Sequence, residues 1–480
     1  MTSEKLKLKK PGEIRTRIAP SPTGFMHIGL ARTALFNYLF AKKHEGVLVL
    51  RIEDTDRERS SLGSEKDIME SLQWLGINWD EGPYRQSQRL EIYKKYLENL
   101  LAEDKAYYCF CPEEELEAQK QYQMSQGLAP RYSGKCANLS REKVKQCLAE
   151  KKPCVIRFRV QDKKISFNDL IRDKLEFDTG LIGDIVVAKD INTPLYNFAV
   201  AVDDFEMKIS HVIRGEEHIS NTPKQILIQQ ALGFPQPVYA HLPLILGQDK
   251  TKLSKRHGAV SVLQFKKQGY LPEALVNFMA FLGWNPGGER EIYAMNSLIK
   301  EFSLDKVQKS GAVFNVKKLD FLNGFYIRQR SPEKIAGLCL PYLAEAGLEA
   351  DLNLLQKVVS IYQERLKKIS EIVELADFFF KQEIIYDKKL LGWNNMTNRE
   401  IKKSLDKLDK ILHKIKIEEW KKENLENILL AETGEDRGRL LWPLRAALTG
   451  KKASAGPFEI AEILGKEKTL QRIKEARKKL

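Results

Sequence analysis

The hydrophobic pattern changes period twice near the start of the chain, and each change predicts a new element. Alternation over 15–19 predicts a short strand, whereas apolar positions three and four residues apart over 28–42 predict an amphipathic helix. The prolines and glycine of 20–24 exclude a helix between them, because proline fixes φ and carries no N–H donor. The continuous apolar run 47–50 predicts a strand buried on both faces, which completes a parallel strand–helix–strand unit.

A second series of alternating elements occupies the middle of the chain. We expect strands over 184–188, 211–214 and 238–246, a helix over 194–202, and another helix that begins at Asn221-Thr222-Pro223. If both series are halves of one doubly wound sheet, the residues between them form an insertion mounted on that sheet.

The last third of the chain has a different texture. Lys, Glu, Leu and Ile dominate from about Ser331 onward, and glycines and prolines are few, as in 364–381 and 399–422. This pattern predicts helices. The sequence therefore predicts an α/β region followed by an all-α region, with no internal repeat of the solenoid type.

Composition narrows the class of protein. The 480 residues are 43% hydrophobic and 30% charged, which argues against a disordered chain and a membrane protein. The longest apolar stretch, 274–284, is too short to span a bilayer, and the basic start 5–10 leads into no apolar signal core. We therefore predict a cytoplasmic protein. An excess of 79 Lys and Arg over 65 Asp and Glu gives a net charge of +14, which is typical of proteins that bind polyanions.

Two segments carry candidate chemistry. The turn 20–29 brings His27 and two glycines to the start of a helix, where free N–H groups attract anions. Residues 250–258 form a strongly cationic loop after the last strand of the second series. Each has a plain alternative, a capping histidine in the first case and a solvated loop in the second. Their common place after strands favours a ligand site, since open α/β sheets bind ligands at the carboxyl ends of their strands.

These two segments resemble the HIGH and KMSKS signatures of class I aminoacyl-tRNA synthetases. The resemblance to the glutamyl-tRNA synthetase family continues, in the same order, through 17–24, 51–56, 196–200, 213–218, 271–275, 318–323 and 442–450. It implies a Rossmann-type α/β catalytic domain with an inserted α+β acceptor-binding domain, followed by an all-α C-terminal anticodon-binding region. The corresponding ranges are the first half of the Rossmann domain (1–99), the inserted acceptor-stem-binding domain (100–184), the second Rossmann half (185–248), the KMSKS loop with a stem-contact domain (249–330), and the anticodon-binding region, which we expect to have two subdomains (331–480).

The resemblance implies that ATP with Mg²⁺ activates L-glutamate to glutamyl-adenylate, which is then transferred to the 3′-terminal adenosine of tRNA(Glu). This chemistry needs no enzyme nucleophile; it needs positioning, and positive charge where negative charge develops. The implied catalytic residues are His27, Lys252, Lys255 and Arg256. The implied ATP-binding residues are Gly24, His27, Gly29, Glu217, Leu253, Ser254 and Lys255.

Recognition of glutamate requires reading a second carboxylate, for which a guanidinium fork is better shaped than an ammonium. The resemblance assigns this task to Arg17 and Arg214, and assigns the substrate ammonium to Glu53 with help from Tyr196. The alternative for Glu53 is a structural ion pair with a neighbouring arginine. Val200 stands where some members carry asparagine, so we expect a backbone contact at most. The implied glutamate-binding residues are Arg17, Ala19, Ser21, Glu53, Tyr196, Val200 and Arg214.

A cluster of cysteines lies in the predicted insertion. Cys109, Cys111 and Cys136, together with Tyr132, resemble the zinc site of some family members, in which a tyrosine is one ligand. Thiolates are good zinc ligands, and closed four-coordinate zinc sites are usually structural. The alternative is a group of reduced, partly buried cysteines without metal. We interpret the other cysteines as packing residues, namely Cys147, Cys154 and Cys339.

The resemblance implies tRNA, L-glutamate and ATP as partners, a monomer, and no membrane. Whether tRNA(Gln) is charged together with tRNA(Glu) stays open. A short glutamyl-queuosine paralogue is disfavoured by the length of the chain, and a glutamine-specific enzyme by the two arginines and the helical tail. A non-catalytic tRNA-binding or regulatory paralogue is the alternative from another class, against which the intact His27, Gly29 and Lys255 argue. The lysine-rich positions of 402–414 can contact phosphates or form a solvated face.

Overall fold

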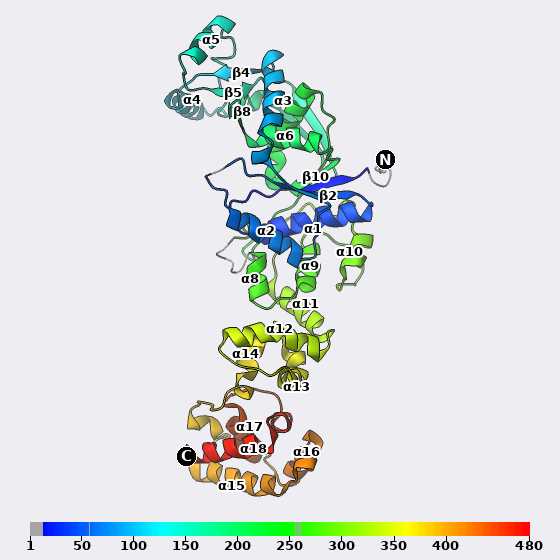
Figure 1. Cartoon of the computed structure of the whole chain (residues 1–480), viewed down its shortest axis with the longest axis vertical. Helices are drawn as coiled ribbons and strands as arrows, with labels where there is room; N and C mark the ends of the chain where they lie inside the picture. The colour runs from blue at the N-terminus through cyan, green and yellow to red at the C-terminus, as the bar shows by residue number, and fades with distance from the viewer. Residues whose placement is uncertain (1–12, 57, 255, 257, 259–260) are drawn as a thin grey trace. The chain divides into compact units, whose positions relative to one another are not determined.

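The structure is a computed structural model that describes residues 13–56, 58–254, 256, 258 and 261–480. The chain divides into two compact units, Met1–Phe265 with Leu275–Val316, and Lys266–Ala274 with Lys317–Leu480. Figure 1 shows the elements of both units, coloured from blue at the N-terminus to red at the C-terminus.

The first unit is built on parallel strands. These are β1 (Arg15–Ile18), β2 (Val47–Ile52), β3 (Glu81–Arg85), β10 (His211–Gly215) and β11 (Val238–Leu242). β1, β2 and β3 form one parallel sheet, and β10 and β11 form a parallel pair. A hydrogen bond from Ser210 N to Arg15 O, 3.0 Å long, connects the start of β10 to β1. The predicted parallel strand–helix–strand unit is confirmed.

Helices cover both faces of these strands. They are α1 (Ile28–Lys43), α2 (Leu62–Trp74), α3 (Leu90–Ala102), α6 (Tyr196–Glu206) and α7 (Thr222–Leu232). In Figure 1, α1 and α2 lie on one side of β2 and β10, and α3 and α6 lie on the other. After its first residue β2 is buried throughout, which explains why residues 47–50 are apolar without alternation.

One predicted strand is interrupted. We expected a strand over 238–246, but β11 ends at Leu242, and β12 (Ile245–Leu246) pairs instead with β13 (Ala312–Val313). Pro243 follows the end of β11 and has no N–H to donate to a ladder, so the pairing stops there.

Another predicted strand forms in a different sheet. The strand expected over 184–188 is β8 (Ile185–Asp190), and it pairs antiparallel with β5 (Val155–Phe158) rather than joining the parallel strands. Its placement in the parallel sheet was therefore wrong, because a short apolar run does not reveal its pairing partner. The other elements around this antiparallel sheet are β4 (Ala106–Cys109), β9 (Thr193–Pro194), α4 (Glu113–Ser125) and α5 (Arg141–Ala149).

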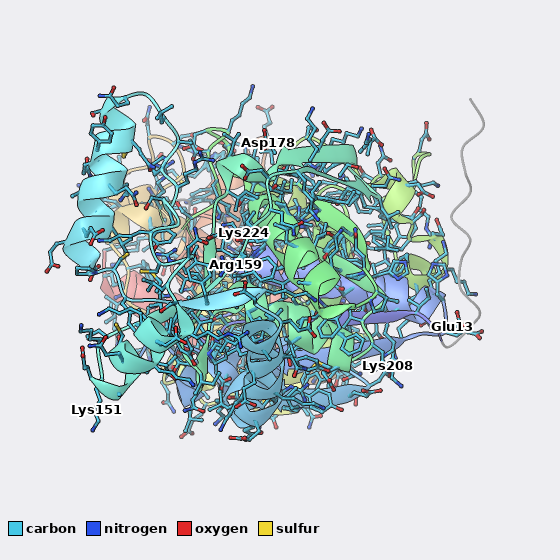
Figure 2. All side chains as sticks on the ribbon, turned by 90° about the horizontal axis from the view of Figure 1, so that it is seen from above. Glu13, Lys151, Arg159, Asp178, Lys208 and Lys224 are labelled. Carbon is cyan, nitrogen blue, oxygen red and sulfur yellow. The ribbon has the colours of Figure 1, made fainter. Side chains whose placement is uncertain are left out.

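The predicted insertion also contributes to the parallel strands. Its hairpin of β6 (Lys164–Asp169) and β7 (Asp173–Asp178) joins β11 where Tyr239 pairs with Asp169. Charged side chains project from the surface of this unit, among them the exposed Lys151 and Lys208 that are labelled in Figure 2. The remaining helices before residue 316 are α8 (Val262–Lys267), α9 (Pro272–Ala280) and α10 (Met295–Glu301).

The second unit contains helices and, among its described residues, no strand. Its helices from 316 onward are α11 (Val316–Arg328), α12 (Pro332–Glu345), α13 (Leu352–Tyr362), α14 (Glu371–Ala376), α15 (Asn398–Lys414), α16 (Lys422–Ala431), α17 (Gly438–Thr449) and α18 (Pro457–Lys478). In α15 the buried residues Ile401, Leu405, Leu408 and Leu412 form one stripe at helical spacing. The predicted all-α tail is confirmed.

Candidate active site

His27 caps α1. Its Nδ1 accepts a hydrogen bond from the backbone N–H of Leu30 (3.2 Å), and the helix begins at the next residue, Ile28. Because Nδ1 accepts, the proton of the neutral ring lies on Nε2, which is left as the donor. A Cβ at position 29 would lie 3.1 Å from the His27 ring, so Gly29 keeps room for this cap. The capping role is real, and it leaves the second ring nitrogen for a ligand.

The surroundings of His27 keep its ring neutral. His27 is solvent-accessible at the surface, yet enough protein atoms surround its ring to desolvate it in part. This partial burial lowers the pKa of His27; the negative charge of Glu217 opposes the shift, and the positive charge of Lys252 adds to it. A neutral imidazole at neutral pH follows. Glu217 and Lys252 are thus close enough to His27 to act on its charge.

The histidine-bearing turn and the lysine-bearing loop meet although they are far apart in the sequence. The N–H of Val262 donates to the carbonyl of Met26 (2.9 Å), and His27 forms an antiparallel bridge with Ser261. These contacts lie immediately after the lysine-bearing loop. The structure therefore brings the two segments with candidate chemistry to the same end of α1.

The lysine-bearing loop is tied back to β12 through the N–H of Leu253, which donates to a carbonyl of that strand (2.9 Å). Lys252 and Arg256 are exposed, and Arg256 pairs with Asp249 at 3.3 Å. Lys255 lies outside the described residues. Two of the predicted phosphate-binding cations can thus be placed. Lys252 lies near His27, and Arg256 forms an ion pair within its own loop.

The two arginines predicted to read a carboxylate lie on strands of the same parallel core. Arg17 belongs to β1 and Arg214 to β10, and both are 5% exposed. Arg17 Nε donates to Asp204 Oδ1 at 3.2 Å. Burial is the main reason that the pKa of Arg214 is lowered, and the positive charge of Arg17 lowers it further. The second effect requires the two guanidinium groups to be near each other.

Arg214 is held by three uncharged acceptors. Its Nε donates to His241 Nε2 (3.2 Å), its Nη1 to Gln225 Oε1 (2.9 Å) and its Nη2 to Thr222 Oγ1 (2.8 Å). All three partners are buried. The guanidinium is therefore fixed in position without a carboxylate among its hydrogen-bond partners in the described part of the chain.

Glu53 takes part in a buried ion-pair network. Its Oε1 accepts from Arg51 Nη2 (3.0 Å) and Nε (3.3 Å), and Arg51 Nη1 also donates to Asp204 Oδ1 (2.7 Å). The structural ion pair that was the alternative for Glu53 is therefore present. Burial nevertheless raises the pKa of Glu53, because Arg51 offsets only part of the cost of burying the charge. An additional cation at this carboxylate would stabilise its ionised form.

Tyr196 begins α6 and contacts His218. Its hydroxyl lies 3.2 Å from His218 Nδ1. Burial, followed by the charge of Glu53, raises the pKa of Tyr196 to about 12 against the opposing effect of Arg214. Burial and the charge of Arg214 lower the pKa of His218 to about 4. Both groups are therefore neutral at neutral pH and are suited to donate or accept hydrogen bonds.

The other predicted residues differ in what they offer a ligand. Ser21 and Gly24 are exposed in the turn before α1, as is Ser254 in the lysine-bearing loop, and Ala19 is half-buried. Val200 is buried in the interior of α6, where the helical ladder uses its N–H. The backbone contact expected of Val200 stays a prediction.

Sequence reasoning missed the buried polar residues that hold the arginines in place. Asp204 follows the apolar run 198–202 of α6 and is buried, and a buried acidic residue in such a helix indicates a cation partner. That signal was available, whereas nothing in the sequence connected Asp169 or His241 with Arg214. His241 lies beside Arg214 because β10 pairs with β11, and Asp169 reaches His241 because β6 joins β11; sequence periodicity predicted neither register.

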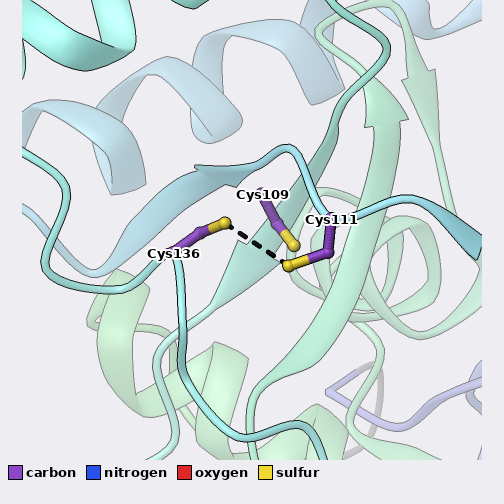
Figure 3. A group of neighbouring side chains, drawn as sticks. All are labelled: Cys109, Cys111 and Cys136. Carbon is purple, nitrogen blue, oxygen red and sulfur yellow. Dashed lines mark hydrogen bonds between the residues drawn. The ribbon is translucent and has the colours of Figure 1, made fainter. Parts of the chain in front are cut away.

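The predicted metal ligands do come together. The Sγ atoms of Cys109, Cys111 and Cys136 lie within 4.8 Å of one another, and Cys111 is 3.5 Å from Cys136 (Figure 3). The hydroxyl of Tyr132 is 3.3 Å from two of these sulfurs, those of Cys109 and Cys111. A tetrahedral zinc ion with bonds of about 2.3 Å requires ligand separations of about 3.8 Å. Donor type and spacing thus fit zinc.

None of the helices in the described part of the chain combines the length and hydropathy that a membrane span requires.

Comparison with known proteins gives a consistent result. Residues 13–321 match the family "tRNA synthetases class I (E and Q), catalytic domain", and residues 334–477 match "Anticodon binding domain". The glutamate–tRNA ligase of Carboxydothermus hydrogenoformans is 47% identical over 477 residues, which cover 96% of this chain and 99% of that protein. The enzyme of the same name from Bacillus velezensis is 43% identical over 96% of this chain and 99% of that protein. A crystal structure of a glutamate tRNA ligase from Elizabethkingia meningosepticum, in complex with its amino acid, superposes with a TM-score of 0.86 at 36% identity, covering 98% of this chain and all of that one.

Proposed function

This chain belongs to the class I tRNA synthetases of the glutamate and glutamine type, and we propose that the residues of the first unit described above carry out its chemistry. The activity is that of a glutamate–tRNA ligase, which uses ATP with Mg²⁺, glutamate and tRNA. No observation favours a non-catalytic tRNA-binding paralogue.

In the activation step, an oxygen of the substrate α-carboxylate attacks the α-phosphorus of ATP. The bond from that phosphorus to the bridging oxygen breaks, and pyrophosphate leaves with the electron pair. His27 Nε2–H and the Lys252 ammonium donate to phosphate oxygens on which negative charge grows, and Lys255 and Arg256 add positive charge from the same loop. Glu217, Gly24, Gly29, Leu253 and Ser254 line the nucleotide. In the transfer step a terminal ribose hydroxyl of tRNA attacks the activated carbonyl and AMP leaves.

The side chain of glutamate is read by the buried arginines. Arg214 offers a guanidinium whose bonded neighbours carry no charge, and Arg17 adds a second cation nearby. Glu53 binds the substrate ammonium. The positive charge of that group stabilises the ionised form of the Glu53 carboxylate, whose pKa is raised by burial. Tyr196, anchored by its contact with His218, donates to the substrate. Ala19, Ser21 and Val200 shape the surroundings.

The observation that carries this proposal is the meeting of the turn at Met26 and His27 with the chain at Ser261 and Val262, in the unit that also buries the arginines. Exchange of labelled pyrophosphate into ATP tests it with each amino acid, with and without tRNA. We expect exchange with glutamate that tRNA stimulates. Exchange with glutamine alone would replace the proposal, and no exchange with any amino acid would refute it.

We propose zinc as a structural ion held by Cys109, Cys111, Tyr132 and Cys136. When bound, it would crosslink β4 to the loop after α4, in a region whose apolar core is small. Elemental analysis of the purified, folded chain should find one zinc per molecule. Absence of zinc from folded protein would leave these residues as a reduced cysteine cluster.

Regions outside the activation site receive coarser proposals. We propose that the segment 100–184 binds the acceptor stem, that 249–330 contacts the stem, and that 331–480 reads the anticodon, in keeping with the match of 334–477. The tRNA accepted is tRNA(Glu), and tRNA(Gln) is proposed as an additional substrate. We also propose a cytoplasmic monomer; charging assays with each purified tRNA and light scattering test these points.

A further inference from the structure

One of the three hydrogen-bond partners of Arg214 is His241, a residue that the sequence did not connect with the site. His241 and its neighbour Asp169 are completely or almost completely buried, with 0% and 4% exposed. His241 Nδ1 lies 2.6 Å from Asp169 Oδ2, and His241 Nε2 accepts from Arg214 Nε at 3.2 Å. The imidazole therefore stands between a carboxylate and the guanidinium.

The position of the ring proton follows from both sides of this contact. An arginine Nε–H is always a donor, so the His241 Nε2 that faces it must be the unprotonated nitrogen. The proton then lies on Nδ1, where Asp169 Oδ2 accepts it. The other carboxylate oxygen, Oδ1, accepts the backbone N–H groups of Ile171, Arg172 and His241 at 2.9, 2.9 and 3.2 Å. Asp169 is thus fixed by the backbone and imposes one tautomer on His241.

The ring is neutral in this arrangement. Burial lowers the pKa of His241 and the positive charge of Arg214 lowers it further, while Asp169 opposes both. Hydrogen bonding to His241 and to the backbone keeps the pKa of Asp169 low in spite of its burial. Asp169 therefore stays ionised, but its charge is separated from Arg214 by a whole imidazole ring.

Arg17 differs from Arg214 because it is bonded directly to a carboxylate. Its Nε donates directly to the carboxylate of Asp204, at 3.2 Å, so part of its charge is compensated inside the protein. Arg214, by contrast, donates to a ring nitrogen, an amide oxygen and a hydroxyl. A guanidinium that is buried and oriented without a bonded anion gains most from an anionic ligand.

We infer that Asp169 and His241 are positioning residues that hold Arg214 as an oriented cation without a bonded carboxylate, so that the site favours a side-chain carboxylate over the isosteric amide. This inference rests on the proposed function, in which Arg214 meets the glutamate side chain. Neither residue touches the substrate; both act through Arg214. The discrimination between glutamate and glutamine thus depends on the tautomer of His241. That tautomer is set by Asp169 of β6, a strand that carries neither arginine.

The test substitution is Asp169→Asn. With its Oδ1 still held by three backbone N–H groups, the asparagine must present its NH₂ to His241 Nδ1. The ring proton then moves to Nε2, which lies 3.0 Å from Thr222 Oγ1 and 3.2 Å from Arg214 Nε, so the Nε–H of Arg214 loses its acceptor. We expect the KM for glutamate to rise about 10- to 100-fold, the preference for glutamate over glutamine to narrow, and the KM for ATP to change less than about twofold.

A second substitution restores the acceptor without the carboxylate. In the Asp169→Asn background, His241→Gln presents an amide oxygen to Arg214 and should return the KM for glutamate to within about threefold of the parent. Asp184→Asn is the matched control, because the Asp184 carboxylate likewise accepts from the backbone at Oδ1 (Val160 N) and from a side chain at Oδ2 (Tyr107 OH), but does not contact the arginine pair of the site. It should leave the KM for glutamate unchanged.

The tautomer can be read without any substitution. In nitrogen NMR of the chain labelled at its seven histidines, the signal that His241→Gln removes should be that of a neutral ring protonated on Nδ1 at pH 7. An Nε2-protonated His241 would overturn the inference, as would parallel increases of the KM values for glutamate and ATP in Asp169→Asn. Arg214→Ala separates the two proposals: unchanged glutamate kinetics there would refute the role of Arg214 itself, whereas a large loss there with no effect of Asp169→Asn would refute only the positioning device.

Discussion

The two units hold their positive charge in opposite ways. In the first, Arg17, Arg51 and Arg214 are buried and each is bonded to specific partners. In the second, α15 carries exposed lysines on the face opposite its buried leucines. Burying a guanidinium costs solvation, which only a well-formed set of acceptors offsets, whereas an exposed ammonium loses almost nothing.

The difference separates two kinds of anion recognition. A buried, oriented guanidinium can read one small carboxylate by geometry, and water does not screen it. An exposed lysine acts on a polyanion through a charge that salt screens. Burial alone does not make an arginine a reader, since the buried Arg472 of the second unit donates to the carbonyl oxygens of Leu448 and Phe378 and has a structural role.

The largest effect is expected where the buried network loses its shared anion. Asp204→Ala leaves Arg17 and Arg51 buried without that carboxylate, which should destabilise the first unit by about 3–5 kcal/mol. Urea unfolding measures this loss. Glu301→Ala, which removes the partner of the exposed Arg290, should leave the unfolding midpoint nearly unchanged. Equal effects of the two substitutions would abolish the contrast between buried and exposed pairs.

The exposed Lys252 of the first unit tests whether a cation can contribute to catalysis without being buried. Lys252→Ala should slow glutamate activation about 100-fold, or about 3 kcal/mol, because Lys252 lies close to His27 at the phosphate end of the site. Thermal melting should not change. Lys250→Ala, two residues earlier in the same loop, is the control; a comparable loss there would mean that the loop acts only by its total charge.

A neutral histidine beside the arginines predicts a pH effect. The pKa of His218 is about 4 in the folded protein against 6.5 in the unfolded chain, so between these values the unfolded chain binds more protons. Stability should therefore fall as the pH drops from 6.5, by about 2 kcal/mol between pH 7 and 5 from this residue. His218→Asn should remove that part of the pH dependence in urea titrations. Identical slopes in both proteins would show that burial and the charge of Arg214 do not hold His218 neutral.

The smallest effects are expected in the second unit. Lys410→Ala in α15 should weaken tRNA binding less than about threefold, and should reduce the slope of log Kd against log salt by less than about one. Lys407 is already paired with Glu432 at 3.0 Å, so Lys407→Ala should change that slope even less. A loss of tenfold or more from either substitution would make α15 a specific reader instead of a general electrostatic surface.

The sequence predicted the parallel strands and the helical tail because both are determined by local periodicity and turn chemistry. It did not predict that the strand at 184–188 would pair with β5, or that β6 would reach β11, since both pairings join segments that are distant in the chain. The residues that touch a ligand could be proposed from motifs. Of the residues that orient them, Asp204 left a signal in the sequence, whereas Asp169 and His241 did not, because their contacts arise only once β6, β10 and β11 are paired.

The most direct test of the buried-arginine account compares two stable analogues of glutamyl-adenylate, one with a side-chain carboxylate and one with the amide. Their dissociation constants are measured on the parent protein and on Arg214→Ala. The account predicts that the parent prefers the carboxylate by about 100-fold and that this preference falls to within about threefold in the variant, because the charge that reads the carboxylate is gone. The same preference in both proteins would contradict it.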